Sequence, residues 1–206
     1  QAADLAGATK MDRPEWIAVH SKTGEVYVTL TNNSQRGTPE TPGLNAANPR
    51  PANIFGHIIR WRENNGDAAA SSFEWDIFAL AGDPKNADDN RRGNVKGDAY
   101  GSPDGVCFDP SGRLWIQTDV STSVLNQGDY AALGNNQMLV ADIKSGETRR
   151  FLSGPKGCEL TGMTGIDDPY EAPEQPEVHI HNHARSVSDV VAELLAQLQA
   201  RGLLAE

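Results

Sequence analysis

Two related stretches of sequence decide the fold. Residues 14–28 read PEWIAVHSKTGEVYV, and residues 103–116 read PDGVCFDPSGRLWI. Both begin at a proline, alternate apolar with polar residues, and are interrupted by a turn that contains glycine. That pattern is typical of two short β-strands joined in a hairpin. The chain therefore repeats a β-hairpin unit.

Each of these units is followed by loop material and then by a second hairpin. In the first copy this hairpin lies in residues 56–78, and in the second copy it lies in residues 137–152. A third copy begins at residues 156–161, KGCELT. Four strands per repeat are the unit of a β-propeller blade, and a blade needs neighbours to cover its faces. The sequence thus predicts an all-β fold, a partial β-propeller of about two four-stranded blades and the start of a third.

The repeats occupy only part of the chain. Pattern and composition predict four segments: a flexible lead-in over 1–10, the partial propeller over 11–163, an acidic, Pro-rich linker with a His cluster over 164–185, and an amphipathic C-terminal α-helix over 186–206. Eight strands are expected in the propeller segment, at 16–20, 25–31, 57–62, 73–80, 106–109, 113–118, 137–143 and 148–152. No helix of three turns is expected there.

Composition narrows the classes of partner. The chain of 206 residues carries a formal net charge of −10. Such a charge repels the phosphates of nucleic acids and the surfaces of anionic membranes, so neither is expected as a partner. No apolar run approaches the roughly 20 residues that span a bilayer, and no signal peptide opens the sequence. Two cysteines are too few for a disulfide framework.

Three acidic residues hold the same relative place in successive repeats, namely Glu15, Asp104 and Glu159. In a propeller this place lies near the central channel, so the three carboxylates would converge. Converging carboxylates repel one another unless a cation lies between them, and oxygen clusters suit hard cations such as Ca²⁺. The spacing is equally compatible with acids that end a strand and accept backbone N–H bonds.

Two basic residues are candidates for binding an anion. Arg50 lies in a long polar loop and could hold a phosphate with two parallel hydrogen bonds. Lys156 lies three residues before Glu159 and could reach an anion at the same mouth. Spacing alone favours the plainer alternative, a solvated loop arginine and a surface lysine.

The remaining histidines and cysteines favour structural roles. His57 precedes an apolar run and is best explained as a hydrogen-bonding core residue, and Cys107 and Cys158 as small core residues. Cys158 could also be a soft metal ligand beside Glu159. The alternating His179, His181 and His183 would share one face of a strand, as a metal triad could, but nothing around them supports such a site.

Several motifs together resemble the PhoX-type alkaline phosphatases, the DUF839 family. The match covers about residues 10–163. The motifs are MDRPEW (11–16), YVTLTNN (27–33), NPR (48–50), GHI (56–58), SPDG (102–105), LWIQTD (114–119) and GPKGCELTG (154–162).

The resemblance implies a metal-dependent enzyme that hydrolyses phosphate monoesters with Ca²⁺ and Fe³⁺ ions held by carboxylates and a cysteine. Carried over to this chain, Glu15 and Glu159 are the implied metal ligands, with Asp104 as a third candidate. Arg50 and Lys156 are the candidates for binding the substrate phosphate, and no residue is assigned as catalytic. The resemblance also implies a monomeric protein exported to the periplasm or beyond.

The sequence departs from the family in two places, because the family's N-terminal half and the continuation after about residue 163 are absent. We therefore expect a truncated form. One alternative is a non-catalytic propeller remnant that self-associates through its open sheet edges. Another is a binding or scaffold segment whose terminal helix contacts a partner.

Overall fold

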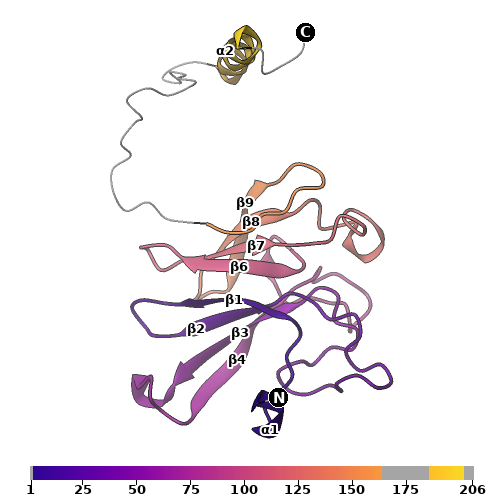
Figure 1. Cartoon of the computed structure of the whole chain (residues 1–206), viewed down its shortest axis with the longest axis vertical. Coiled ribbons are helices and arrows are strands. Elements are labelled where there is room, and N and C mark those ends of the chain that lie inside the picture. Colours follow the sequence, from indigo (N-terminus) through magenta and orange to yellow (C-terminus); the bar gives the residue numbers. More distant parts are fainter. Residues whose placement is uncertain (1, 164–185, 202–206) are drawn as a thin grey trace. The chain divides into compact units, whose positions relative to one another are not determined.

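In a computed structural model of the protein, residues 2–163 and 186–201 are described. The chain divides into two compact units, Gln1–Gly165 and Ile166–Glu206. The first unit contains two β-sheets that lie side by side (Figure 1). The all-β fold with a C-terminal helix is confirmed.

The first sheet has four antiparallel strands in chain order (Figure 1). They are β1 (Pro14–Val19), β2 (Val26–Leu30), β3 (His57–Glu63) and β4 (Phe73–Leu80). Valine, isoleucine and aromatic residues dominate them, as expected for strands that bury at least one face. Strand β2 is the most buried, because it lies between β1 and β3 and faces the second sheet.

The second sheet repeats this order and adds one short strand. It contains β6 (Pro103–Phe108), β7 (Leu114–Thr118), β8 (Gln137–Ala141) and β9 (Glu147–Ser153). The added strand, β5 (Lys96–Gly97), pairs in parallel with the outer edge of β9. The eight predicted strands are thus present with ends shifted by a few residues, and β5 is the strand that the sequence pattern missed.

The internal repeat extends to the backbone angles. Arg13 and Ser102, the residues before the first proline of each sheet, both have positive φ values, 48° and 52°. In both sheets the pairing register then shifts, between Pro14 and Ile17 in β1 and between Pro103 and Val106 in β6. Such bulges are frequent next to functional sites because they redirect side chains. The two sheets therefore present equivalent residues at equivalent irregularities.

The inner strands join the two sheets into one core. Strand β6 contacts both β1 and β2. The buried ring of Tyr27 packs edge-on against Phe78 and Phe108, with ring centroids 5.2 Å apart in each pair. The hydroxyl of Thr29 donates to the backbone carbonyl of Asp104 over 2.6 Å. Aromatic packing and this hydrogen bond fix β6, and with it Asp104, against the first sheet.

Two predicted segments differ from the structure. Residues 2–5 form a single helical turn, α1 (Ala2–Leu5), where only a flexible lead-in was predicted. Residues 154–163, the expected start of a third blade, contain no strand. Two isolated 3₁₀ turns, Asn64–Gly66 and Gly128–Tyr130, interrupt the loops without adding a longer helix.

The second unit is described only through its helix, α2 (Val187–Ala200). Ser186 caps it, because the Ser186 hydroxyl accepts a hydrogen bond from the backbone N–H of Asp189 over 3.2 Å. The predicted linker and the histidines at 179, 181 and 183 lie outside the described residues. Among the described helices, none is long and apolar enough to cross a membrane.

Candidate functional site

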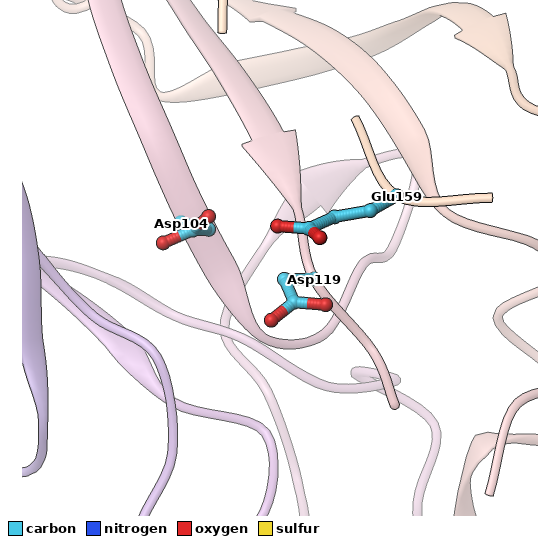
Figure 2. Close-up of side chains that lie close together, drawn as sticks. All are labelled: Asp104, Asp119 and Glu159. Atoms are coloured by element: carbon cyan, nitrogen blue, oxygen red, sulfur yellow. The ribbon is translucent and has the colours of Figure 1, made fainter. Parts of the chain in front are cut away.

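Three carboxylates come together beside the inner strands of the second sheet. Asp104 lies in the bulge of β6, Asp119 directly follows β7, and Glu159 lies in the segment after β9. One oxygen from each lies within 4.8 Å of the others. Figure 2 shows the three side chains pointing into one shared space. We call these three residues the acidic cluster.

The acidic cluster extends from the core to the surface. Asp104 is buried, Asp119 is half-buried and Glu159 is exposed. Asp119, Cys158 and Glu159 also line a surface pocket of about 320 Å³. A ligand that enters from solvent could therefore reach the cluster without displacing the core.

Asp104 lies among several other negatively charged side chains. Burial, together with the negative charges of Glu15, Asp119 and Glu159, raises the pKa of Asp104 to about 6. The nearby charge of Arg13 acts in the opposite direction. Clustered acids of this kind lose their mutual repulsion when a cation binds between them. The donor set consists of carboxylate oxygens, which are the ligands that Ca²⁺ prefers.

The structure brings two of the three predicted metal ligands, Asp104 and Glu159, into the acidic cluster. Glu15 is close enough to influence Asp104, but its carboxylate is paired with the Arg13 guanidinium at 3.2 Å. The structure therefore places Glu15 beside the acidic cluster and outside its group of converging oxygens. Its role as a ligand stays a prediction.

Two residues of this region were missed by the sequence reasoning. Asp119 ends the LWIQTD motif, and its signal was its position one residue past β7, at the end of the sheet where Asp104 lies. Arg13 begins the Arg-Pro-Glu motif, and its guanidinium binds Glu15 and donates to the side-chain oxygen of Asn32 over 3.1 Å. Arg13 and Asp119 line a second surface pocket of about 240 Å³.

Arg50 is placed within the protein interior. Its guanidinium donates to the carbonyls of Ala81 and Gly56 and to the side-chain oxygen of Asn53, and the side chain is almost wholly buried. Burial lowers the pKa of Arg50 to about 10. These contacts give Arg50 the structural role of joining its long loop to β3 and to the end of β4. They do not bring it to the acidic cluster.

Lys156 is exposed on the turn after β9. It lines a pocket of about 600 Å³ together with Leu125 and Gln127, and it is not among the residues of the acidic cluster. The structure thus separates the two basic residues that the sequence proposed for phosphate binding. A substrate role for Lys156 stays a prediction.

His57 is a buried hydrogen-bonding residue, as the sequence favoured, whereas both cysteines are half-buried and not buried core residues as expected. The buried His57 ring contacts the carbonyl of Ala47 at 2.7 Å and the amide nitrogen of Asn53 at 3.0 Å, and burial lowers its pKa to about 4. Both cysteines are free. Cys107 lies on β6, where burial raises the pKa of its thiol. The Sγ atom of Cys158 lies against Gly154, so the thiol is not part of the acidic cluster.

Two repeated sheets joined at their inner strands, with acidic residues gathered at a bulge, define a β-propeller-type protein. The family model of the alkaline phosphatase PhoX matches residues 1–169. A solved structure of PhoX from Pseudomonas fluorescens, in complex with the transition-state analogue vanadate, is 50% identical with a TM-score of 0.72. That comparison covers 78% of this chain and 28% of the other chain. The chain belongs to the PhoX alkaline phosphatase family.

Curated proteins of sulfate activation give shorter matches. The adenylyl-sulfate kinase of Aeromonas hydrophila is 50% identical over 46 residues, which is 22% of this chain and 23% of that protein. The corresponding kinase of Myxococcus xanthus is 37% identical over 67 residues, 32% of this chain and 34% of its own length. The chain therefore spans about a third or less of these relatives. The sequence given contains no phosphate-binding Walker motif.

Proposed function

We propose that this chain contributes the acidic cluster to a metal-assisted hydrolysis of phosphate monoesters. The observation that carries the proposal is the convergence of Asp104, Asp119 and Glu159 within 4.8 Å, in a family of alkaline phosphatases. A structural relative that binds vanadate as a transition-state analogue supports phosphoryl-group chemistry at this fold.

The acidic cluster is suited to holding Ca²⁺. Asp104 supplies a buried carboxylate, Asp119 a half-buried one, and Glu159 an exposed one that completes the site from the solvent side. A bound cation supplies charge that offsets the negative phosphoryl oxygens and orients them. The Fe³⁺ ions and their cysteine ligand rest on the family resemblance alone, because the acidic cluster contains no thiol.

Arg13 is our candidate for contacting the substrate phosphate. Its guanidinium lies at the pocket that Asp119 also lines, and Glu15 and Asn32 orient it. A guanidinium fixed in this way can donate two parallel hydrogen bonds to phosphate oxygens. Arg13 would therefore bind and orient the substrate while the carboxylates hold the cation.

Hydrolysis of p-nitrophenyl phosphate at alkaline pH, with Ca²⁺ and iron supplied, tests the proposal. We expect activity in the wild type and its loss in Glu159→Gln, which removes one charge from the acidic cluster. The matched control is Glu147→Gln, since Glu147 is exposed, pairs with Arg149 two residues further along β9, and lies outside the acidic cluster. Absence of activity in all three proteins would refute the proposal that this chain is catalytic by itself.

A second candidate function, self-association, is favoured by one specific observation. Trp16, Ile17 and Val19 on β1 are exposed by 44%, 59% and 58%. Apolar side chains gathered on one strand are typical of an interaction surface. Sedimentation over a range of concentrations tests it, and Ile17→Lys should shift the protein toward the monomer. A wild type that stays monomeric at all concentrations would exclude this candidate.

For the location of the protein we propose the periplasm or the exterior of the cell, on the family resemblance. Fractionation of the native host tests this. Recovery of the protein with cytoplasmic markers would contradict it.

A further inference from the structure

Asn136 lines the surface pocket of about 320 Å³ together with Asp119 and Glu159, and its side chain hydrogen-bonds to the residues next to both of them. The residue directly precedes β8, and only 1% of its surface is exposed. Its side-chain amide faces the segment after β7, which carries Asp119, and the segment after β9, which carries Glu159. Two of the three carboxylates thus lie on segments that meet at one buried side chain.

The amide oxygen of Asn136 holds the two neighbours of Asp119. The Thr118 hydroxyl donates to it over 3.1 Å, and the backbone N–H of Val120 donates to it over 2.7 Å. The amide nitrogen returns one bond to the carbonyl of Val120 over 3.0 Å. Residues 118 and 120 are therefore held by Asn136, and this fixes the backbone that carries Asp119.

The second N–H of the same amide holds the residue before Glu159. It donates to the carbonyl of Cys158 over 3.0 Å. The backbone of Asn136 adds a bond, since its carbonyl accepts from the N–H of Gly154 over 2.7 Å. All four hydrogen-bonding positions of the amide are used, two on oxygen and two on nitrogen.

We propose that Asn136 is a positioning residue that sets the separation of Asp119 and Glu159 and thereby the affinity of the acidic cluster for a divalent cation. This inference rests on the proposed function, because it presumes that the cluster binds a cation. Groups that orient metal ligands from behind typically change metal affinity by about 10- to 100-fold when removed. Because its amide is bonded to Thr118, Val120 and Cys158, Asn136 would act through the positions of Asp119 and Glu159.

The first sheet has a glycine at the position where the second sheet has Asn136. Gly56 holds the corresponding place, directly before β3, with a φ of 71°. A Cβ atom there would lie 2.1 Å from the carbonyl oxygen of Thr31, so no side chain fits. Thr31 follows β2 as Asp119 follows β7. The second sheet, which carries Asp119, is therefore also the sheet in which an asparagine side chain fits directly before the third strand.

Calorimetric titration with Ca²⁺ alone tests the inference without an activity assay. We expect Asn136→Ala to bind Ca²⁺ about 10- to 100-fold more weakly than the wild type. The matched control is Asn53→Ala, which removes an equally buried asparagine amide from the first sheet and should keep wild-type affinity. Equal affinity of wild type and Asn136→Ala, or equal weakening in both variants, would overturn the positioning role.

Backbone ¹⁵N relaxation of the metal-free protein separates this inference from the proposed function. Asn136→Ala should increase the motion of the Asp119 and Glu159 amides, and Asn53→Ala should not. If the wild type binds no Ca²⁺, the proposed metal site fails and so does the effect of Asn136 on affinity. Unchanged motion in the variant would overturn the positioning of the two carboxylates even where Ca²⁺ binds.

A milder variant guards against loss of folding. Thr118→Val removes one of the two donors to the Asn136 oxygen while keeping the size of the side chain. We expect a weakening of Ca²⁺ binding in the same direction and smaller than that of Asn136→Ala. Unchanged Ca²⁺ affinity in a folded Thr118→Val would count against the inference.

Discussion

The two sheets share one plan and differ in how they treat charge. Each begins with a residue of positive φ, a proline and a bulge, and each places an acid in the bulge. In the first sheet that acid, Glu15, is paired with Arg13. In the second sheet Asp104 has no such pair among the residues that the structure describes, and it faces two further carboxylates. The acid in the bulge of the first sheet is therefore paired with a cation, whereas the acid in the bulge of the second sheet lies among like charges.

The loops next to the first sheet bury a further ion pair in a hydrogen-bonded network. Arg36 and Asp12 are both fully buried and form an ion pair over 2.6 Å. Asn33 and Asn53 donate to the same Asp12 carboxylate, and the Asn48 side chain accepts from its backbone N–H. Every carboxylate oxygen of Asp12 thus has a partner. This network stabilises the long loop over residues 31–56, whereas the three carboxylates of the acidic cluster face one another.

The comparison shows where a binding site can arise in a repeated fold. An internally paired charge holds structure and offers nothing to solvent. A cluster of like charges costs stability until a cation binds, and so couples folding to a ligand. Separate variants can therefore disrupt the buried network and the acidic cluster.

Removing Arg36 should have the largest effect. Arg36→Met leaves the Asp12 carboxylate buried without its cation, and we expect a loss of about 3–5 kcal/mol in the free energy of unfolding. Urea denaturation measures it. The double variant with Asp12→Asn should recover much of this loss, because no unpaired charge remains. A loss below about 1 kcal/mol in Arg36→Met would indicate a solvated pair instead.

Acidification should weaken the first sheet through His57. The folded-state pKa of His57 is about 4, against 6.5 for a free histidine, so the unfolded chain binds the extra proton between these values. The contribution of neutral His57 is therefore complete above pH 6.5 and is lost as the pH falls toward 4, by about 3 kcal/mol in total.

The measurement is the free energy of unfolding from pH 7 to pH 4. His57→Gln is the matched control. Gln137 begins β8 in the second sheet just as His57 begins β3 in the first, so a glutamine is a side chain that this position of the repeat already carries. The variant should lose this part of the pH dependence. An unchanged profile in His57→Gln would assign the acid sensitivity to other groups.

Asp119→Asn should have opposite effects with and without a cation. In EDTA the variant should gain about 1 kcal/mol or less in stability, because one of several like charges near Asp104 is removed. With Ca²⁺ at 100 times its dissociation constant the wild type should gain about 2.7 kcal/mol, and the variant should not. Thermal unfolding in both buffers checks this. Equal stabilisation of both proteins by Ca²⁺ would place the cation elsewhere.

The sequence predicted the local elements well and the packing of side chains poorly. Strands follow from alternation and turn residues, so the hairpins were found; β5 is two residues long and held by pairing to β9, which no local pattern records. Asp104 and Glu159 were found because the repeat places them at equivalent positions. Asp119 and Asn136 were not, since their importance depends on contacts between segments far apart in the chain.

Arg50 is a residue that the sequence reasoning proposed for binding and that the structure places in the interior. A loop arginine looks solvated or ligand-binding in sequence, because nothing local shows that three acceptors from the loop and the neighbouring strands surround it. The start of a third blade was predicted from a motif that forms no strand in the structure. There Glu159 serves the cluster without belonging to a strand.

The smallest predicted effect tests the joint between the two sheets. The Thr29 hydroxyl accepts from the backbone N–H of Trp16 over 3.0 Å and donates to the carbonyl of Asp104 over 2.6 Å, so it links the bulges of β1 and β6. Thr29→Val keeps the shape of the side chain and removes both bonds. We expect a loss of about 1 kcal/mol in the free energy of unfolding, with unchanged sheet content by circular dichroism.

The same variant asks whether the first sheet contributes to the acidic cluster at all. If the link positions Asp104, Thr29→Val should also weaken Ca²⁺ binding, and by less than Asn136→Ala does, because the second sheet holds Asp119 and Glu159 by itself. A variant that loses stability but keeps full Ca²⁺ affinity would show that the second sheet builds its site without help from the first. The first sheet would then contribute to the core against which the second sheet packs, and not to the acidic cluster.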